Sequence, residues 1–109
     1  MIIGCFQESA NGFTGHLSTL TLDAMLAIVP AESAAENAPD WRVLLGDAES
    51  GTEVGAGWSR TGERAGSYVA LQIDDPALGV PLRANLIRTA QHSDTHHLLW
   101  SRPAPRERA

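Results

Sequence analysis

The chain has 109 residues, 43% apolar and 19% charged, which fits one globular domain that can bury an apolar core without disulfides or a structural metal. It has one cysteine, Cys5, no basic leader and no run of about 18 apolar residues. These features exclude an internal disulfide and predict a cytoplasmic protein without a membrane-spanning helix. The net charge of −5 argues at first against a polyanionic partner.

The charge is unevenly distributed along the chain. All eight basic residues are arginines. Residues 1–59 hold one arginine against eight acids, a net −7, whereas residues 60–109 hold seven arginines against five acids, a net +2. Such asymmetry gives a surface with two signs of charge unless folding interleaves the two halves.

Period-two patterning between closely spaced turn signals predicts strands along most of the chain. In chain order, the predicted strands are residues 2–7, 13–20, 21–29, 41–46, 52–59, 67–73, 81–90 and 97–101. Asn11-Gly12 predicts a tight hairpin between the first two, because both residues tolerate a positive φ. Residues 21–29 also fit a short helix, and the long loop at residues 30–40 has room for a helical turn at residues 33–36.

Alternation also assigns faces to the strands. Residues 67–73 show the pattern most clearly, with positions 69, 71 and 73 inward and positions 68, 70 and 72 outward. In residues 52–59, Val54, Ala56 and Trp58 share one face, and the glycines at 55 and 57 mark a bulge or a close approach. Because Trp41, Trp58 and Trp100 are each in phase with aliphatic residues, we expect all three in the core.

Seven or eight short strands at this spacing predict an all-β fold, an antiparallel meander that forms a small barrel or a sandwich. The sequence leaves closure open, and an unpaired strand edge would permit dimerisation. Residues 1–102 are expected to form a single domain, and residues 103–109, charged and with two prolines, a flexible tail.

Several blocks of sequence together resemble one protein family. They are Ile3-Gly4 with Phe6, Asn11-Gly12-Phe13-Thr14-Gly15, Leu20-Thr21-Leu22, Asn37-Ala38-Pro39-Asp40-Trp41-Arg42-Val43, Gly55-Ala56-Gly57-Trp58, Ser67-Tyr68-Val69-Ala70-Leu71 followed by Ile73-Asp74-Asp75-Pro76, and Leu99-Trp100-Ser101-Arg102. In these blocks the chain resembles the domain-of-unknown-function family 736, small bacterial proteins often encoded on plasmids and integrative elements. The resemblance implies a context but no activity. It departs in the central hairpin, where members commonly read Trp-Lys-Lys-Thr-Ser-x-x-Gly: this chain reads Trp58-Ser59-Arg60-Thr61-Gly62-Glu63-Arg64, which keeps basic residues but adds Glu63.

Residues that often carry catalysis fall here in patterns typical of structure. Cys5 lies between apolar neighbours on a predicted strand, which indicates a buried, inert thiol. His16 alternates away from its apolar neighbours and is expected at the surface. Asp74-Asp75-Pro76 reads as a turn, and adjacent residues of a strand face opposite ways, so the two acids make a poor acid–base pair. We therefore expect no catalytic residue and no cofactor.

The loop before the last predicted strand contains the clearest candidates for metal ligands. Imidazole and carboxylate groups cluster there within six residues, at His92, Asp94, His96 and His97. No further ligand stands at a standard spacing, so a polar hairpin loop is the simpler interpretation and a metal site or an unrecognised enzyme the third hypothesis for function.

The remaining candidate is a polar and aromatic face of the sheet. Tyr68 and Gln72 are out of phase with the apolar residues of their strand, Arg83 and Asn85 share a face of the next, and Arg60 and Arg64 can rim this surface. Stacking combined with phosphate contacts is how small barrels hold single-stranded nucleic acids. Single-stranded DNA or RNA binding is therefore the second hypothesis.

The first hypothesis is a non-enzymatic accessory protein of a mobile element that binds a protein partner. The acidic charge and the lack of catalytic motifs favour it, and an acidic surface can inhibit a host factor by imitating nucleic acid. The sequence does not define the oligomeric state.

Overall fold

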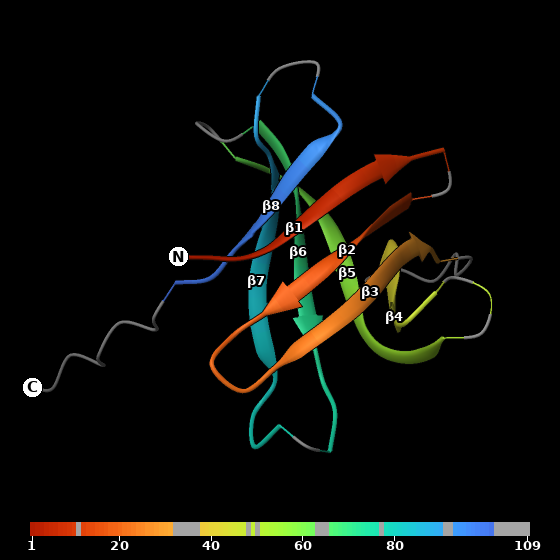
Figure 1. Cartoon of the computed structure of the whole chain (residues 1–109). Coiled ribbons are helices and arrows are strands. Elements are labelled where there is room, and N and C mark those ends of the chain that lie inside the picture. Colours follow the sequence, from red (N-terminus) through yellow and green to blue (C-terminus); the bar gives the residue numbers. More distant parts are fainter. Residues whose placement is uncertain are drawn as a thin grey trace, which may run out of the picture.

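The fold is a closed, eight-stranded antiparallel barrel, seen in a computed structural model (Figure 1). The structure describes residues 1–10, 12–31, 38–47, 49, 51–62, 66–76, 78–90 and 93–101. Its strands are β1 (Ile2–Ser9), β2 (Gly12–Ser18), β3 (Asp23–Pro30), β4 (Trp41–Leu45), β5 (Thr52–Gly62), β6 (Gly66–Ile73), β7 (Leu82–Arg88) and β8 (Thr95–Leu99). No described residue is helical, and no helix in this part of the chain is long and apolar enough to cross a membrane.

Each strand pairs with the next along the chain, and β8 pairs with β1 to close the barrel. This confirms the predicted all-β meander and decides between its two forms in favour of the barrel. Residues 21–29, for which a helix was the alternative, contribute strand β3. The helical turn predicted at residues 33–36 and the tail at residues 103–109 lie outside the described residues.

The apolar core fills the inside of the barrel. The largest fully buried side chains come from five different strands: Phe6, Ile28, Val43, Leu86 and Leu98. An eight-stranded barrel is just wide enough for inward side chains to fill its interior. The inward assignment of Val69, Leu71 and Ile73 is confirmed, since all three are buried.

Strand β5 corrects one prediction. The register between β4 and β5 shifts at Val43/Leu44, where Val43 pairs with Gly55 and Leu44 pairs with Glu53, so Val54 is an extra, bulged residue. Beyond the bulge, the residues of β5 face the side opposite to the predicted one. Gly57 pairs with Leu71, which faces inward, so Gly57 faces inward as well. Trp58 therefore lies on the outer face, not in the core.

The other two tryptophans do pack against the core, each half-buried. Trp41 stands at the first position of β4, and Trp100 follows β8, where its backbone N–H donates to the carbonyl oxygen of Met1. These two residues mark opposite ends of the barrel. Trp100 lies where β8 ends and β1 begins, whereas Trp41 lies where β4 begins and β1 ends, because alternate strands run in opposite directions.

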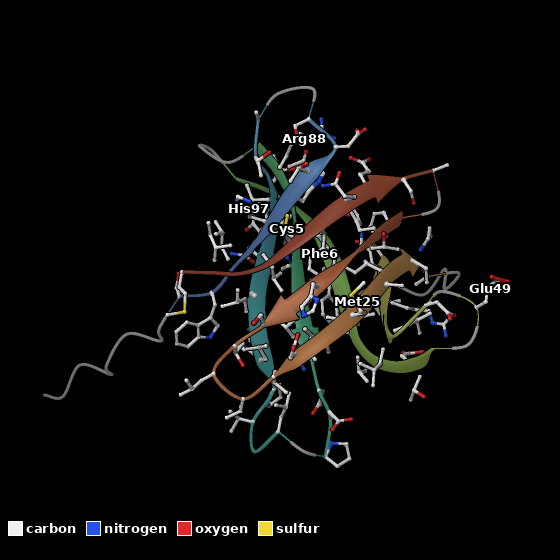
Figure 2. The ribbon with its side chains drawn as sticks, viewed as in Figure 1. Cys5, Phe6, Met25, Glu49, Arg88 and His97 are labelled. Atoms are coloured by element: carbon white, nitrogen blue, oxygen red, sulfur yellow. The ribbon has the colours of Figure 1, made fainter. Side chains whose placement is uncertain are left out.

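Cys5 corrects a second prediction. Its side chain is exposed on the outer face of β1, whereas its neighbour Phe6 is fully buried (Figure 2). Apolar neighbours in the sequence predicted burial, but alternation along the strand sends Cys5 outward. His16, predicted at the surface, is exposed and is paired with Asp23.

Candidate functional site

The outer face of β5–β8 brings together most of the predicted binding residues. In the register of these strands, Trp58 is opposite Ala70, Ala70 is opposite Asn85, and Asn85 is opposite Leu99. Directly opposed residues share a face. The flanking pairs are Arg60 with Tyr68 and Gln72 with Arg83, so one continuous surface crosses four strands.

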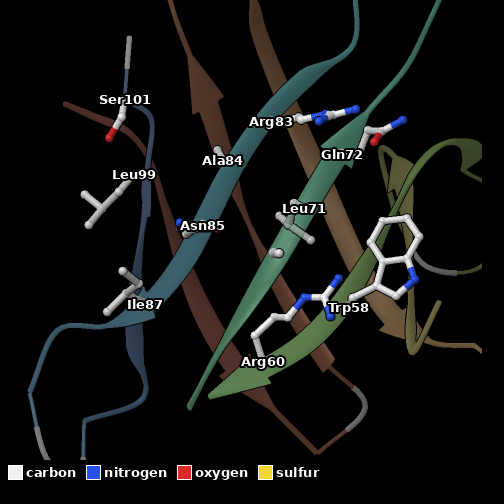
Figure 3. A pocket seen from close by; sticks show the side chains of 11 residues that line it. Trp58, Arg60, Leu71, Gln72, Arg83, Ala84, Asn85, Ile87, Leu99 and Ser101 are labelled. Carbon is white, nitrogen blue, oxygen red and sulfur yellow. The ribbon is translucent and has the colours of Figure 1, made fainter. Parts of the chain in front are cut away.

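A groove of about 640 Å³ lies on this face (Figure 3). Trp58, Arg60, Gln72 and Arg83 line one side of it, and Ile87, Leu99 and Ser101 line the other, with Asn85 between them. The chain carries 13 acids, yet no described carboxylate lines the groove.

The described arginines divide into two kinds. Arg42 donates to Glu53 over 3.0 Å, and Arg88 donates to Glu8 over 3.0 Å. Arg60 and Arg83 are exposed and form no ion pair with any described residue. Among the described arginines, the two without an ion pair are therefore the two in the groove.

A second cavity, of about 690 Å³, opens at one end of the barrel, which we call the mouth. Phe13, Trp41, Tyr68 and His96 are among the residues that line it. Arg60 lines both the mouth and the groove, so the two cavities adjoin.

The described members of the candidate metal-ligand cluster, Asp94, His96 and His97, do not form a metal site. His96 is 7% exposed and points into the mouth, whereas His97 faces outward between Cys5 and Ile87, because neighbours on a strand face opposite ways. Asp94 is exposed, and His92 lies outside the described residues. Among the residues that the structure describes, no three potential ligands lie close enough to hold a metal ion.

A scan against protein families matches residues 2–103 to the family described as "Protein of unknown function (DUF736)". The chain belongs to this family. A search of the curated proteins and a search of the solved structures each found no match.

Within this DUF736 chain, sequence reasoning placed Tyr68, Gln72, Arg83 and Asn85 on one face with Arg60 at its rim, and the strand register puts all five on one outer face. The groove takes four of them, and Tyr68 instead lines the mouth. Arg64 lies outside the described residues.

Sequence reasoning missed one groove residue of chemical interest, Trp58, because it assumed unbroken alternation through residues 52–59. The glycines at 55 and 57 were the available signal, since they indicated a bulge. The shift of one residue in the pairing register at that bulge exchanges the two faces of β5 and moves Trp58 outward.

Proposed function

We propose that this DUF736 protein is a non-enzymatic module that binds single-stranded nucleic acid along the groove of β5–β8. The observation that carries the proposal is the pair of arginines without an ion pair, Arg60 and Arg83, in a groove whose described lining contains an indole and two amides but no carboxylate.

Each of these groups matches a part of a single strand. Guanidinium groups bind phosphate oxygens with a planar, bidentate geometry. The amides of Gln72 and Asn85 can donate and accept hydrogen bonds at the edge of an unpaired base. Both side chains line the groove. Trp58 adds aromatic area on which a base can stack.

The net charge of −5 does not oppose binding at this site. Charges separated by more than a Debye length, about 8 Å at physiological ionic strength, are largely screened. The potential in the groove therefore depends on the charges near it: Arg60 and Arg83, together with Asp74 and the Arg42-paired Glu53, which line an adjoining pocket with Trp58 and Gln72. The global negative charge instead limits non-specific attachment to polyanions elsewhere on the surface.

The test is fluorescence anisotropy of labelled single-stranded DNA and RNA of mixed sequence, titrated at low and at moderate salt. We expect saturable binding that weakens as salt rises. Arg60→Gln and Arg83→Gln should each weaken binding about 5-fold to 10-fold and reduce the slope of log affinity against log salt by about 0.7, the value for one phosphate contact on a single strand.

Arg42→Gln is the matched control, because Arg42 lies on the outer surface of β4 and lines neither the groove nor the mouth. It should leave the affinity unchanged. Absence of binding at low salt, where phosphate attraction is strongest, would refute the proposal, as would equal effects of all three substitutions.

A protein partner is the second candidate, and the apolar side of the groove favours it. Ile87 and Leu99 are half-buried there and offer aliphatic contact area. Under this candidate the chain is an accessory protein of a bacterial mobile element, and Ile87→Ser should abolish capture of the partner from a host extract. We also infer a cytoplasmic setting, because an exposed free thiol such as Cys5 is typical of reducing compartments.

A further inference from the structure

We propose that the mouth of the barrel is a pocket for one nucleobase of the strand whose backbone follows the groove. This inference rests on the proposed function and goes further, because it assigns a role to a second cavity with a different lining. A cavity of about 690 Å³ falls within the range of pockets that enclose small ligands, roughly 300–1,000 Å³.

The inner wall of the mouth is aromatic. The ring centroid of Phe13 lies 5.4 Å from that of Trp41 and 4.9 Å from that of His96, with interplanar angles of 58° and 74°. Phe13 and His96 are only 6% and 7% exposed, so the half-buried indole of Trp41, supported by these two rings, offers most of the accessible aromatic surface. An aromatic face of this kind suits a flat heterocyclic ring better than an aliphatic chain, which has no π-system to stack.

The rim of the mouth supplies hydrogen-bonding groups of both kinds. The carboxylate of Glu8 is held by Arg88 at 3.0 Å and lies 3.9 Å from Nε2 of His96. The hydroxyl of Ser59 accepts the indole N–H of Trp41 at 3.0 Å. The edge of a nucleobase presents donors and acceptors side by side, which this mixed rim can match.

Arg60 connects the two cavities. It lines both, and on the neighbouring strand it is opposite Tyr68, which lines the mouth. A phosphate held by Arg60 therefore stands at the junction. The base attached to it can turn over the rim toward Trp41 while the rest of the strand remains over Gln72 and Arg83. Unstacking is cheap in a single strand, which makes this step accessible.

The three tryptophans allow a direct test by NMR of the ¹⁵N-labelled protein. Trp58 reports on the groove, Trp41 on the mouth, and Trp100 on the opposite end of the barrel. Their indole N–H signals are assigned with Trp41→Phe, Trp58→Phe and Trp100→Phe. We expect a 10-nucleotide strand to shift the signals of Trp41 and Trp58 with one dissociation constant. Trp100, between the groove residues Leu99 and Ser101, can respond to groove binding but not to a base in the mouth.

A strand of equal length that lacks its bases completes the experiment. Its phosphates still meet Arg60 and Arg83, so we expect it to bind, more weakly, without shifting the Trp41 signal. If the intact strand shifts Trp58 alone, or if both strands shift Trp41 equally, the base pocket is refuted and groove binding stands. If the intact strand binds nowhere at low salt, the proposed function itself fails.

Discussion

Glycine at position 55 shows how little space the barrel wall leaves at single residues. Gly55 lies between two strands, opposite Val43 of β4 and Ile73 of β6. A Cβ atom there would lie 2.3 Å from the backbone carbonyl oxygen of Gln72. Backbone atoms cannot rotate away as a side chain can, so any larger residue must displace β6 from β5.

We therefore expect Gly55→Ala to lower the free energy of unfolding by about 1–3 kcal/mol, as overpacking does. Gly79→Ala is the matched control, because a Cβ at Gly79 meets no atom within 4 Å and the residue has no positive φ. It should stay within about 0.5 kcal/mol of the parent chain. Urea unfolding followed by tryptophan fluorescence measures both, and equal stabilities would contradict the close approach.

At the scale of single elements, the sequence predicted the face of a side chain correctly where the strand pairing has no register shift. In β6 no register shift interrupts the pairing, so alternation placed Tyr68 and Gln72 outward correctly. In β5 the extra residue Val54 exchanges the faces, so the same rule failed for Trp58. Strand ends were also misplaced: β5 continues to Gly62 because its backbone pairs with Gly66, which apolar patterning cannot reveal.

The bulge predicts a specific response to deletion of Val54. Because one residue of slip moves every following side chain to the other face, the deletion forces either Trp58 and Arg60 inward or Glu53 inward. Val54→Ala is the control, since it removes buried methyl groups and keeps the register, at about 1–2 kcal/mol. Chemical denaturation should show the deletion to be clearly less stable. If the two variants unfold together, the bulge does not set the faces of β5.

At the scale of the molecule, the meander decides how charge is distributed. Consecutive strands are neighbours around the barrel, so β1–β4 and β5–β8 form its two halves and the sequence halves are not interleaved. The halves still meet at their edges: Glu53 lines a pocket with Trp58 and Gln72 of the groove, and Glu8 lines the mouth with Arg60. Closure itself was not predictable from local pattern, because it depends on pairs such as Gly4 with Leu98, which are distant in the sequence.

Screening beyond about 8 Å predicts that the position of a carboxylate matters more than the net charge. Asn85→Asp places a negative charge in the groove with no change of shape, close to the phosphates that Arg60 and Arg83 would bind, and should weaken single-strand binding at least 10-fold. Glu49→Gln removes a carboxylate from the turn between β4 and β5, on the far side of the barrel from β7 and β8 (Figure 2). At physiological salt screening should make its effect on affinity less than 2-fold. Anisotropy titrations of both variants at matched ionic strength separate the two cases: similar effects would mean that binding follows the net charge of the protein and that the groove is not the site.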